Sequence, residues 1–256
     1  MDSKFSSFII ILLILSFLQW KFPWRRSSRY GLDFLKGLFL HLGLIGLGNF
    51  LVWMSFSVIL PFLNWQKILA GKTLMGSFLQ WLPGSFLIGL LILDLLLYFQ
   101  HRLMHQVDAL WKIHRLHHTD RKMDVTTGLR FHPLEILFST IYKIFVCFLF
   151  GIPYEVYLTF EVYLLFGSLF SHSNIRITGS IERILSLLFV TPRMHYIHHF
   201  TDSHFQNKNF GFLLNIWDRI FGSFVKKSDH QIRHQDLGVR GRMVTGFFSG
   251  LKDPFS

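Results

Sequence analysis

Apolar segments with few ionisable side chains recur over the first 171 residues of the chain. An α-helix rises about 1.5 Å per residue, so about 20 such residues cross the roughly 30 Å hydrocarbon core of a bilayer. The pattern predicts membrane-spanning helices at residues 5–20, 37–66, 73–93, 134–150 and 156–171. We therefore expect an all-α fold, a polytopic membrane helical bundle.

The ends of these segments carry further signals. The first segment is short, and a cleaved signal peptide is its rival interpretation, but no small-x-small cleavage site precedes Lys21. We therefore favour a retained anchor. The second segment ends with Pro61 and Trp65, which suit a turn at the membrane interface. Gly151 and Pro153 separate the fourth and fifth segments and favour a tight reversal, so these two segments are predicted to form a helical hairpin.

The distribution of Lys and Arg predicts the orientation of these helices. If residues 21–36 are cytosolic and the five segments alternate in direction, only Lys4, Lys67 and Lys72 lie outside, and Lys143 lies within a segment. That leaves 22 of the 26 basic residues on the cytosolic side, as the positive-inside rule requires. The net charge of +11 then needs no nucleic acid, because a basic face toward anionic lipid headgroups explains it.

Composition agrees with a membrane protein. Apolar residues make up 51% of the chain and charged residues only 16%, too little charge for a water-soluble domain of this size. The single cysteine, Cys147, excludes a disulfide framework and a cysteine-based zinc site. Beyond Ser171 no segment predicts a span, and residues 181–190 predict an amphipathic helix lying at the membrane interface.

Nine of the 14 histidines cluster where apolar segments end. They form HRLMH at 101–105, HRLHH at 114–118 and HYIHH at 195–199, with His172 at the end of the fifth segment. Spacings of three and four residues put imidazoles on one face of a helix, within reach of a common centre. The predicted topology places all nine on the cytosolic side, although up to 98 residues separate the boxes. We therefore expect a cytosolic histidine-rich metal-binding cap.

The number of clustered histidines also predicts the number of metal ions. A single histidine is more often a satisfied polar side chain than a ligand. Imidazoles packed side by side are unfavourable to desolvate unless a cation accepts their lone pairs. One tetrahedral zinc ion takes at most four ligands, so the pattern predicts two metal ions.

The three boxes resemble those of the fatty acid hydroxylase/sterol desaturase superfamily of integral-membrane di-iron oxygenases. The resemblance extends over residues 92–224 and includes LWKIHRLHHTD, RFHPLE at 130–135 and NIWDRIFGSF at 215–224. It divides the chain into a membrane anchor with spans at 1–91, a fatty acid hydroxylase/sterol desaturase catalytic region at 92–224 and a basic cytosolic tail at 225–256.

The resemblance implies which histidines hold iron and act in catalysis. It gives both roles to the eight box histidines: His101, His105, His114, His117, His118, His195, His198 and His199. His172 falls in the family's variable middle box, where the fatty acid 2-hydroxylase branch has a paired HxxxH and this chain has a single histidine. The tenth ligand is therefore open, with His132 as the nearest candidate and His204 as a weaker one.

The activity that the resemblance implies is O2-dependent hydroxylation or desaturation of a sterol or fatty-acyl lipid by two iron ions. The chain has no GxGxxG motif, haem motif or ferredoxin cysteine set. Electrons are therefore expected from a separate donor, either a reductase, a cytochrome b5-like or ferredoxin-like protein, or a small reductant. The expected location is multi-pass in the bacterial inner membrane or endoplasmic reticulum, with the active site on the cytosolic face.

Two acids at membrane depth are candidates for tuning the metal site. Asp94 lies seven residues before His101, two helical turns along the same face, and is expected to face the substrate cavity. Glu161 lies eleven residues before His172. Ionisable groups inside a membrane are functional by default. The alternative for both acids is a pairing with another span that serves helix packing.

Two other classes of function are open at this point. A zinc-dependent membrane lipid hydrolase would use three histidines and a water molecule, and would leave at least five box histidines without a role. A protein that binds haem or passes metal across the membrane would distribute its histidines along the membrane depth, whereas these cluster at one face.

Overall fold

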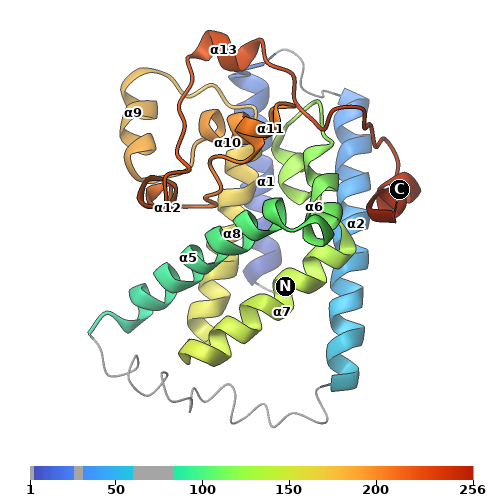
Figure 1. Cartoon of the computed structure of the whole chain (residues 1–256), viewed down its shortest axis with the longest axis vertical. Helices are drawn as coiled ribbons and strands as arrows, with labels where there is room; N and C mark the ends of the chain where they lie inside the picture. The colour runs from blue at the N-terminus through green and yellow to red at the C-terminus, as the bar shows by residue number, and fades with distance from the viewer. Residues whose placement is uncertain (1–2, 26–30, 60–82, 256) are drawn as a thin grey trace.

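The computed structural model describes residues 3–25, 31–59 and 83–255, and Figure 1 shows their arrangement. These residues form helices and three isolated β-bridges, so the predicted all-α class is confirmed. In chain order the elements are α1 Ser3–Lys21, α2 Gly31–Ile59, α5 Ser85–Gln106, α6 Asp108–His118, η2 Val125–Leu129, α7 Pro133–Phe150, α8 Tyr154–His172, α9 Gly179–Leu188, α10 Pro192–His198, α11 Ser203–Gln206, α12 Ile216–Ile220, α13 Asp229–Arg233, α14 Phe247–Lys252 and η3 Asp253–Phe255.

The long helices form one half of the molecule and the short ones the other. Helices α1, α2 and α8 run roughly along the longest axis, while α5 and α7 cross them at a slant (Figure 1). The short helices α9 to α13 gather at the opposite end from the α7–α8 reversal (Figure 1). Large apolar side chains on the long helices face outward, among them Leu13, Phe39 and Trp53. An apolar exterior of this kind suits contact with lipid rather than with water.

Three helices in the described part of the chain are long and apolar enough to cross a membrane: Gly31–Ser55, Ser85–Gln106 and Pro133–Phe150. They mark the chain as a membrane protein. The first and fifth predicted segments also form helices, but α1 contributes a shorter apolar stretch, and α8 carries Glu155 and Glu161, which lower its mean hydropathy.

The boundaries of the second and third segments differ from the prediction. The predicted end of the second, at Pro61 and Trp65, lies outside the described residues, as does the start of the third. Helix α5 begins at Ser85, directly after Gly84, which has a left-handed backbone with φ of 80°. It continues past Leu93 to Gln106 and so carries the whole HRLMH box. That box is therefore part of a helix long and apolar enough to cross a membrane, rather than of the loop that follows it.

The predicted hairpin and the predicted amphipathic helix are both present. Helix α7 ends at Phe150, and Gly151 has a left-handed backbone with φ of 63°, which glycine adopts without a steric penalty. Pro153 then caps the start of α8. Helix α9 exposes Ile181 and Ile184 on its outer side.

The C-terminal basic tail packs against the region that carries the histidine boxes. Asp253 in η3 accepts a hydrogen bond from Arg115 Nε of α6 at 2.9 Å and pairs with Arg242 at 3.1 Å. Arg130 donates to the backbone carbonyl of Val244 at 2.8 Å. Arg115 and Asp253 are both buried, and a buried ion pair of this kind fixes how two elements dock.

Candidate metal centre

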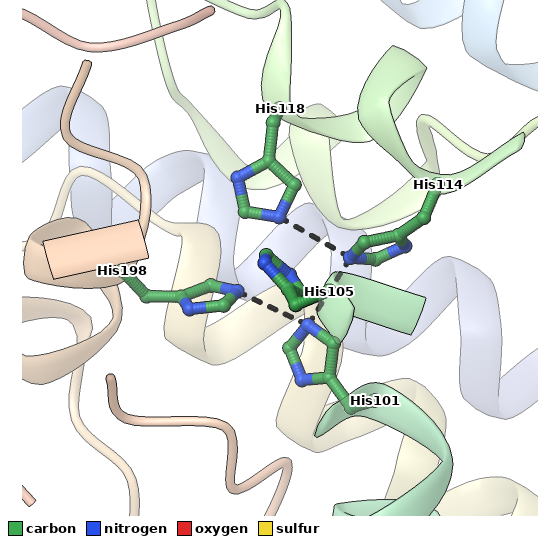
Figure 2. A group of neighbouring side chains, drawn as sticks. All are labelled: His101, His105, His114, His118 and His198. Carbon is green, nitrogen blue, oxygen red and sulfur yellow. Dashed lines mark hydrogen bonds between the residues drawn. The ribbon is translucent and has the colours of Figure 1, made fainter. Parts of the chain in front are cut away.

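The nine clustered histidines converge in two groups, and in each group the ligand nitrogens all lie within 4.8 Å of one another. Site A consists of His101, His105, His114, His118 and His198, whose rings point toward one another in Figure 2. Site B consists of His117, His172, His195 and His199. The eight box histidines and His172, expected from the sequence to bind metal, are thus brought together.

The spacing within the boxes explains how the two sites share the same helices. In HRLHH on α6, the two histidines four residues apart join site A and the remaining one joins site B. In HYIHH, which runs from α10 to the residue that follows it, His195 and His199 join site B and His198 joins site A. HRLMH on α5 adds two ligands to site A, whereas α8 adds only His172 to site B. The position four residues before His172 is Ser168, whose hydroxyl donates to the Gly128 carbonyl.

Hydrogen bonds to the histidine rings determine which ring nitrogens carry lone pairs. In site A, His101 and His198 each direct Nδ1 at a backbone carbonyl, at 2.7 and 2.8 Å, and a carbonyl only accepts. Both Nδ1 atoms therefore carry the proton, so both Nε2 atoms carry lone pairs, yet these lie 3.1 Å apart. The same holds in site B for His117 and His172, whose Nε2 atoms are 2.9 Å apart. Two facing lone pairs repel unless a cation lies between them.

The separations between ring nitrogens also match a coordination sphere. Metal–imidazole bonds of about 2.0–2.1 Å place neighbouring nitrogens about 2.9 Å apart at a right angle and about 3.4 Å apart at the tetrahedral angle. The Nε2–Nε2 contacts within the two sites range from 2.9 to 3.3 Å. The described residues therefore fit two ions, with five ligands in one site and four in the other.

Burial keeps the imidazoles neutral and ready to bind metal. It lowers the pKa of His114 to about 3, and it lowers the pKa values of His117, His118, His195 and His198 well below their ordinary value. A neutral ring keeps the lone pair that a metal needs.

Glu135 orients one of these rings, and the sequence reading assigned it no role although RFHPLE contains it. Its Oε1 accepts a hydrogen bond from His114 Nδ1 at 2.6 Å, which directs Nε2 into site A. A carboxylate behind a metal-binding histidine fixes the tautomer and raises the basicity of the ring. The position of Glu135 in the first turn of α7, two residues after Pro133, was the available signal.

Replacing Glu135 with glutamine keeps the shape and the hydrogen bond but removes the charge. Loss of such a partner costs roughly 10- to 100-fold in metal affinity or activity. We expect Glu135→Gln to lower turnover or metal affinity by about that factor, measured as product formed and metal bound per chain. The matched control is Glu155→Gln, an exposed acid on α8. Equal turnover and equal metal content in the two variants would remove the role of Glu135.

The NIWDRIFGSF motif holds the loop that contacts His101. Buried Asp218 accepts hydrogen bonds from the backbone N–H groups of Phe210 and Gly211, at 2.8 and 2.9 Å, and from the Ser223 hydroxyl at 2.6 Å. The carbonyl of Phe210 in turn accepts the His101 Nδ1 proton. Burial raises the pKa of Asp218, and these hydrogen bonds act in the opposite direction. Asp218 therefore positions the Phe210 carbonyl that accepts the His101 proton.

The expectation that Asp94 faces the substrate cavity is wrong. Its Oδ2 accepts a hydrogen bond from Trp217 Nε1 at 2.8 Å, and Asp94 is not among the residues that line the cavity under His101. The physical reason is that Asp94 and His101 share a face of α5, as predicted, but the loop containing Phe210 covers that face. Asp94 binds α12, which follows this loop, through Trp217.

Glu161 pairs with a side chain on another long helix, as the second of its two predicted roles requires. Its Oε1 lies 2.5 Å from Lys143 Nζ on α7. Both residues line a cavity of about 220 Å³ that reaches His101 and lies between α2, α5, α7 and α8. A larger cavity of about 440 Å³, lined by Lys36 and Arg121 among others, includes none of the nine site histidines in its walls.

The remaining histidine candidates lie outside both sites. His132 caps α7: its Nδ1 accepts the Leu134 N–H at 3.2 Å and its Nε2 donates to the Leu251 carbonyl at 3.3 Å. His204 is exposed on α11. Sequence reading gave no role to His41, which is fully buried in α2 and contacts the Thr126 carbonyl at 2.7 Å. The sequence could have drawn attention to His41, because it lies in a predicted segment, residues 37–66, that has no Asp, Glu, Lys or Arg.

Comparison with known proteins gives a consistent set of relatives. A family model described as fatty acid hydroxylase matches residues 86–223. Ornithine lipid hydroxylase OlsE of Rhizobium tropici is 34% identical over 180 residues, which cover 69% of this chain and 52% of that protein. Alkylglycerol monooxygenase of Homo sapiens is 32% identical over 148 residues, which cover 57% of this chain and 32% of that protein. The chain thus spans about half the length of the first relative and about a third of the second. No solved structure matches the chain.

Proposed function

The chain belongs to the fatty acid hydroxylase family, and we propose that it is a membrane di-iron monooxygenase that hydroxylates a lipid with O2 and external electrons. The observation that carries the proposal is that, in each histidine site, two Nε2 atoms with lone pairs face each other, at 3.1 Å in site A and 2.9 Å in site B. These distances are those expected between two imidazole nitrogens bound to the same metal ion. Two of the relatives are named ornithine lipid hydroxylase and alkylglycerol monooxygenase, which supports the same class of reaction.

Site A and site B would each hold one iron ion. Two ions at these positions would supply the reductive activation of dioxygen that oxidation of an unreactive C–H bond needs. The residues of the chain do the rest. Glu135 orients His114, and the carbonyls of Phe210, Arg130 and Lys208 orient further rings. The cavity walls hold an aliphatic chain near His101 and exclude water from it.

The hydrolase and transport alternatives fit these sites less well. A hydrolytic zinc ion keeps three protein ligands and an open position, whereas site A offers five histidines and site B four. A transport path would place ligands at successive depths, whereas the two sites take their ligands from the C-terminal ends of α5 and α8 and from the short helices α6 and α10. Metal analysis of anaerobically purified protein separates the three classes. We expect two iron ions per chain, and one zinc ion or a haem would overturn the proposal.

We also propose that electrons come from a separate protein or a small reductant. The described residues contain two histidine sites and no cysteine cluster, because the chain has a single cysteine. The donor must therefore reach the two sites from outside the chain. Comparing lipid profiles of cells with and without the gene would identify the substrate.

The proposed topology is multi-pass, with the metal sites and the C-terminus in the cytosol. The bias of 22 basic residues to 3 supports it. Reporter fusions at Asn64 and Ser256 are expected to report opposite sides of the membrane. If both report the same side, the number of spans differs from five and the predicted orientation fails.

A further inference from the structure

His41 is a buried histidine outside both metal sites, and its two ring nitrogens have different partners. Its Nδ1 lies 2.7 Å from the Thr126 carbonyl oxygen, and its Nε2 lies 3.2 Å from Arg130 Nη1. A carbonyl only accepts hydrogen bonds and a guanidinium only donates them. Nδ1 therefore carries the proton and Nε2 the lone pair, so both contacts require the same tautomer. His41 donates to η2 through Thr126 and accepts a hydrogen bond from Arg130.

Arg130 contacts the chain on both sides of His117, a ligand of site B. Its Nε donates to the Leu116 carbonyl at 3.0 Å, and its Nη2 donates to the Thr119 hydroxyl at 2.9 Å. The backbone carbonyl of Arg130 accepts the His117 Nδ1 proton at 3.2 Å. Arg130 is only 3% exposed, so little water is available to replace a lost partner. The orientation of Arg130 therefore affects the direction of the His117 ring.

We infer that His41 is a positioning residue for site B, and that it acts on His117 through Arg130. His41 belongs to α2, outside the residues 86–223 that match the family model. The first three helical turns of α2 thus contribute to a metal site whose ligands all come from other elements. The inference rests on the proposed function, because it requires that site B binds a metal ion.

The effect of His41 is expected to be larger at site B than at site A. Site A has five histidines, and the rings of three of them are held by other groups, two backbone carbonyls and the Glu135 carboxylate. Site B has four histidines, so a misdirected His117 leaves three. A residue that only supported the packing of α2 would weaken both sites alike.

Three substitutions separate the two hydrogen bonds of His41. His41→Gln keeps a donor and an acceptor, and His41→Leu removes both. His41→Asn keeps a donor for the Thr126 carbonyl but is too short to accept from Arg130. The matched control is His230→Leu, the same substitution at an exposed histidine of α13. Membrane insertion and circular dichroism show which variants are folded, and His41→Asn carries the test if His41→Leu is not.

Each site is measured separately in the full chain by removing one ligand of the other site. His198→Ala removes a ligand of site A and leaves site B intact, whereas His195→Ala removes a ligand of site B and leaves site A intact. Each His41 variant and the control are made in both backgrounds. Metal-free protein is titrated with Co²⁺ under anaerobic conditions, and the visible absorbance of the bound ion gives the dissociation constant of the intact site.

We expect His41→Leu and His41→Asn to raise the Co²⁺ dissociation constant of site B at least about tenfold, the lower end of the effect of losing an outer partner, and to change that of site A by less than about threefold. His41→Gln and His230→Leu are expected to leave both constants within about threefold of their values without the substitution. An equal loss at both sites, or an unchanged site B, would overturn the inference. Either result would leave the oxygenase proposal standing, because both sites would still bind metal. Absence of Co²⁺ binding in both backgrounds when His41 is unchanged would overturn the metal sites themselves, and with them the inference.

Discussion

Replacing His117 by alanine is expected to abolish lipid oxidation and to lower the metal content from two ions per chain to one. His117 contributes one of the four nitrogens of site B, and its Nε2 lies 2.9 Å from that of His172. Loss of an outer partner alone costs roughly 10- to 100-fold, so loss of a ligand is expected to cost more than about 100-fold in turnover. His198→Ala is expected to do the same to site A.

The matched control for these variants is His230→Ala, which removes an exposed histidine on α13. All three variants are expected to insert into the membrane, because none of the replaced residues lies in the three helices long and apolar enough to span it. Product formation and metal per chain are measured side by side. Turnover at the wild-type rate in His117→Ala or His198→Ala would show that these sites do not carry the reaction.

Removing the metal is expected to lower the unfolding temperature by about 10 °C or more. Each ion bound at 1,000 times its dissociation constant stabilises the fold by about 4 kcal/mol, and each kcal/mol shifts the midpoint by about 2–4 °C in a chain of this size. Without ions, the buried lone pairs in each site face one another. Thermal unfolding before and after chelation, followed by re-addition of iron, measures the effect.

Acid is expected to destabilise the metal-free protein further. In the folded chain, burial lowers the pKa of His114 to about 3 from the ordinary 6.5, and His117 and His195 shift in the same direction. The unfolded chain therefore binds more protons below pH 6.5, and stability falls as the pH decreases from there. An unfolding temperature that is unaffected by chelation, or one that rises as the pH falls below 6.5, would contradict the buried-site geometry.

The histidine boxes could be predicted because their geometry is local. Spacings of three and four residues fix which rings share a helix face, and the apolar segments fix where the boxes lie along the chain. The division into five and four ligands could not be predicted, since it depends on how α6 and α10 face each other across the site. The single histidine of the middle box was visible in the sequence, and its consequence is the smaller site B.

The features that could not be predicted from the sequence depend on contacts between residues far apart in the chain or on local backbone conformation. Asp94 and Trp217 are 123 residues apart in the sequence, and only the folded structure shows that they form a hydrogen bond. Lys143 and Glu161 could each be identified as a charge within a span, but their pairing depends on the angle between α7 and α8. The position of Ser85 as the first residue of α5 likewise follows from the backbone of Gly84, which no apolar pattern reveals.

The most direct test of the account supplies purified, iron-loaded protein with a reductant, a lipid that it binds and isotopically labelled dioxygen. We predict that the product lipid gains one oxygen atom, that this atom carries the label, and that the yield scales with the content of two iron ions per chain. A product that forms without dioxygen, or whose new oxygen atom comes from labelled water instead, would contradict it.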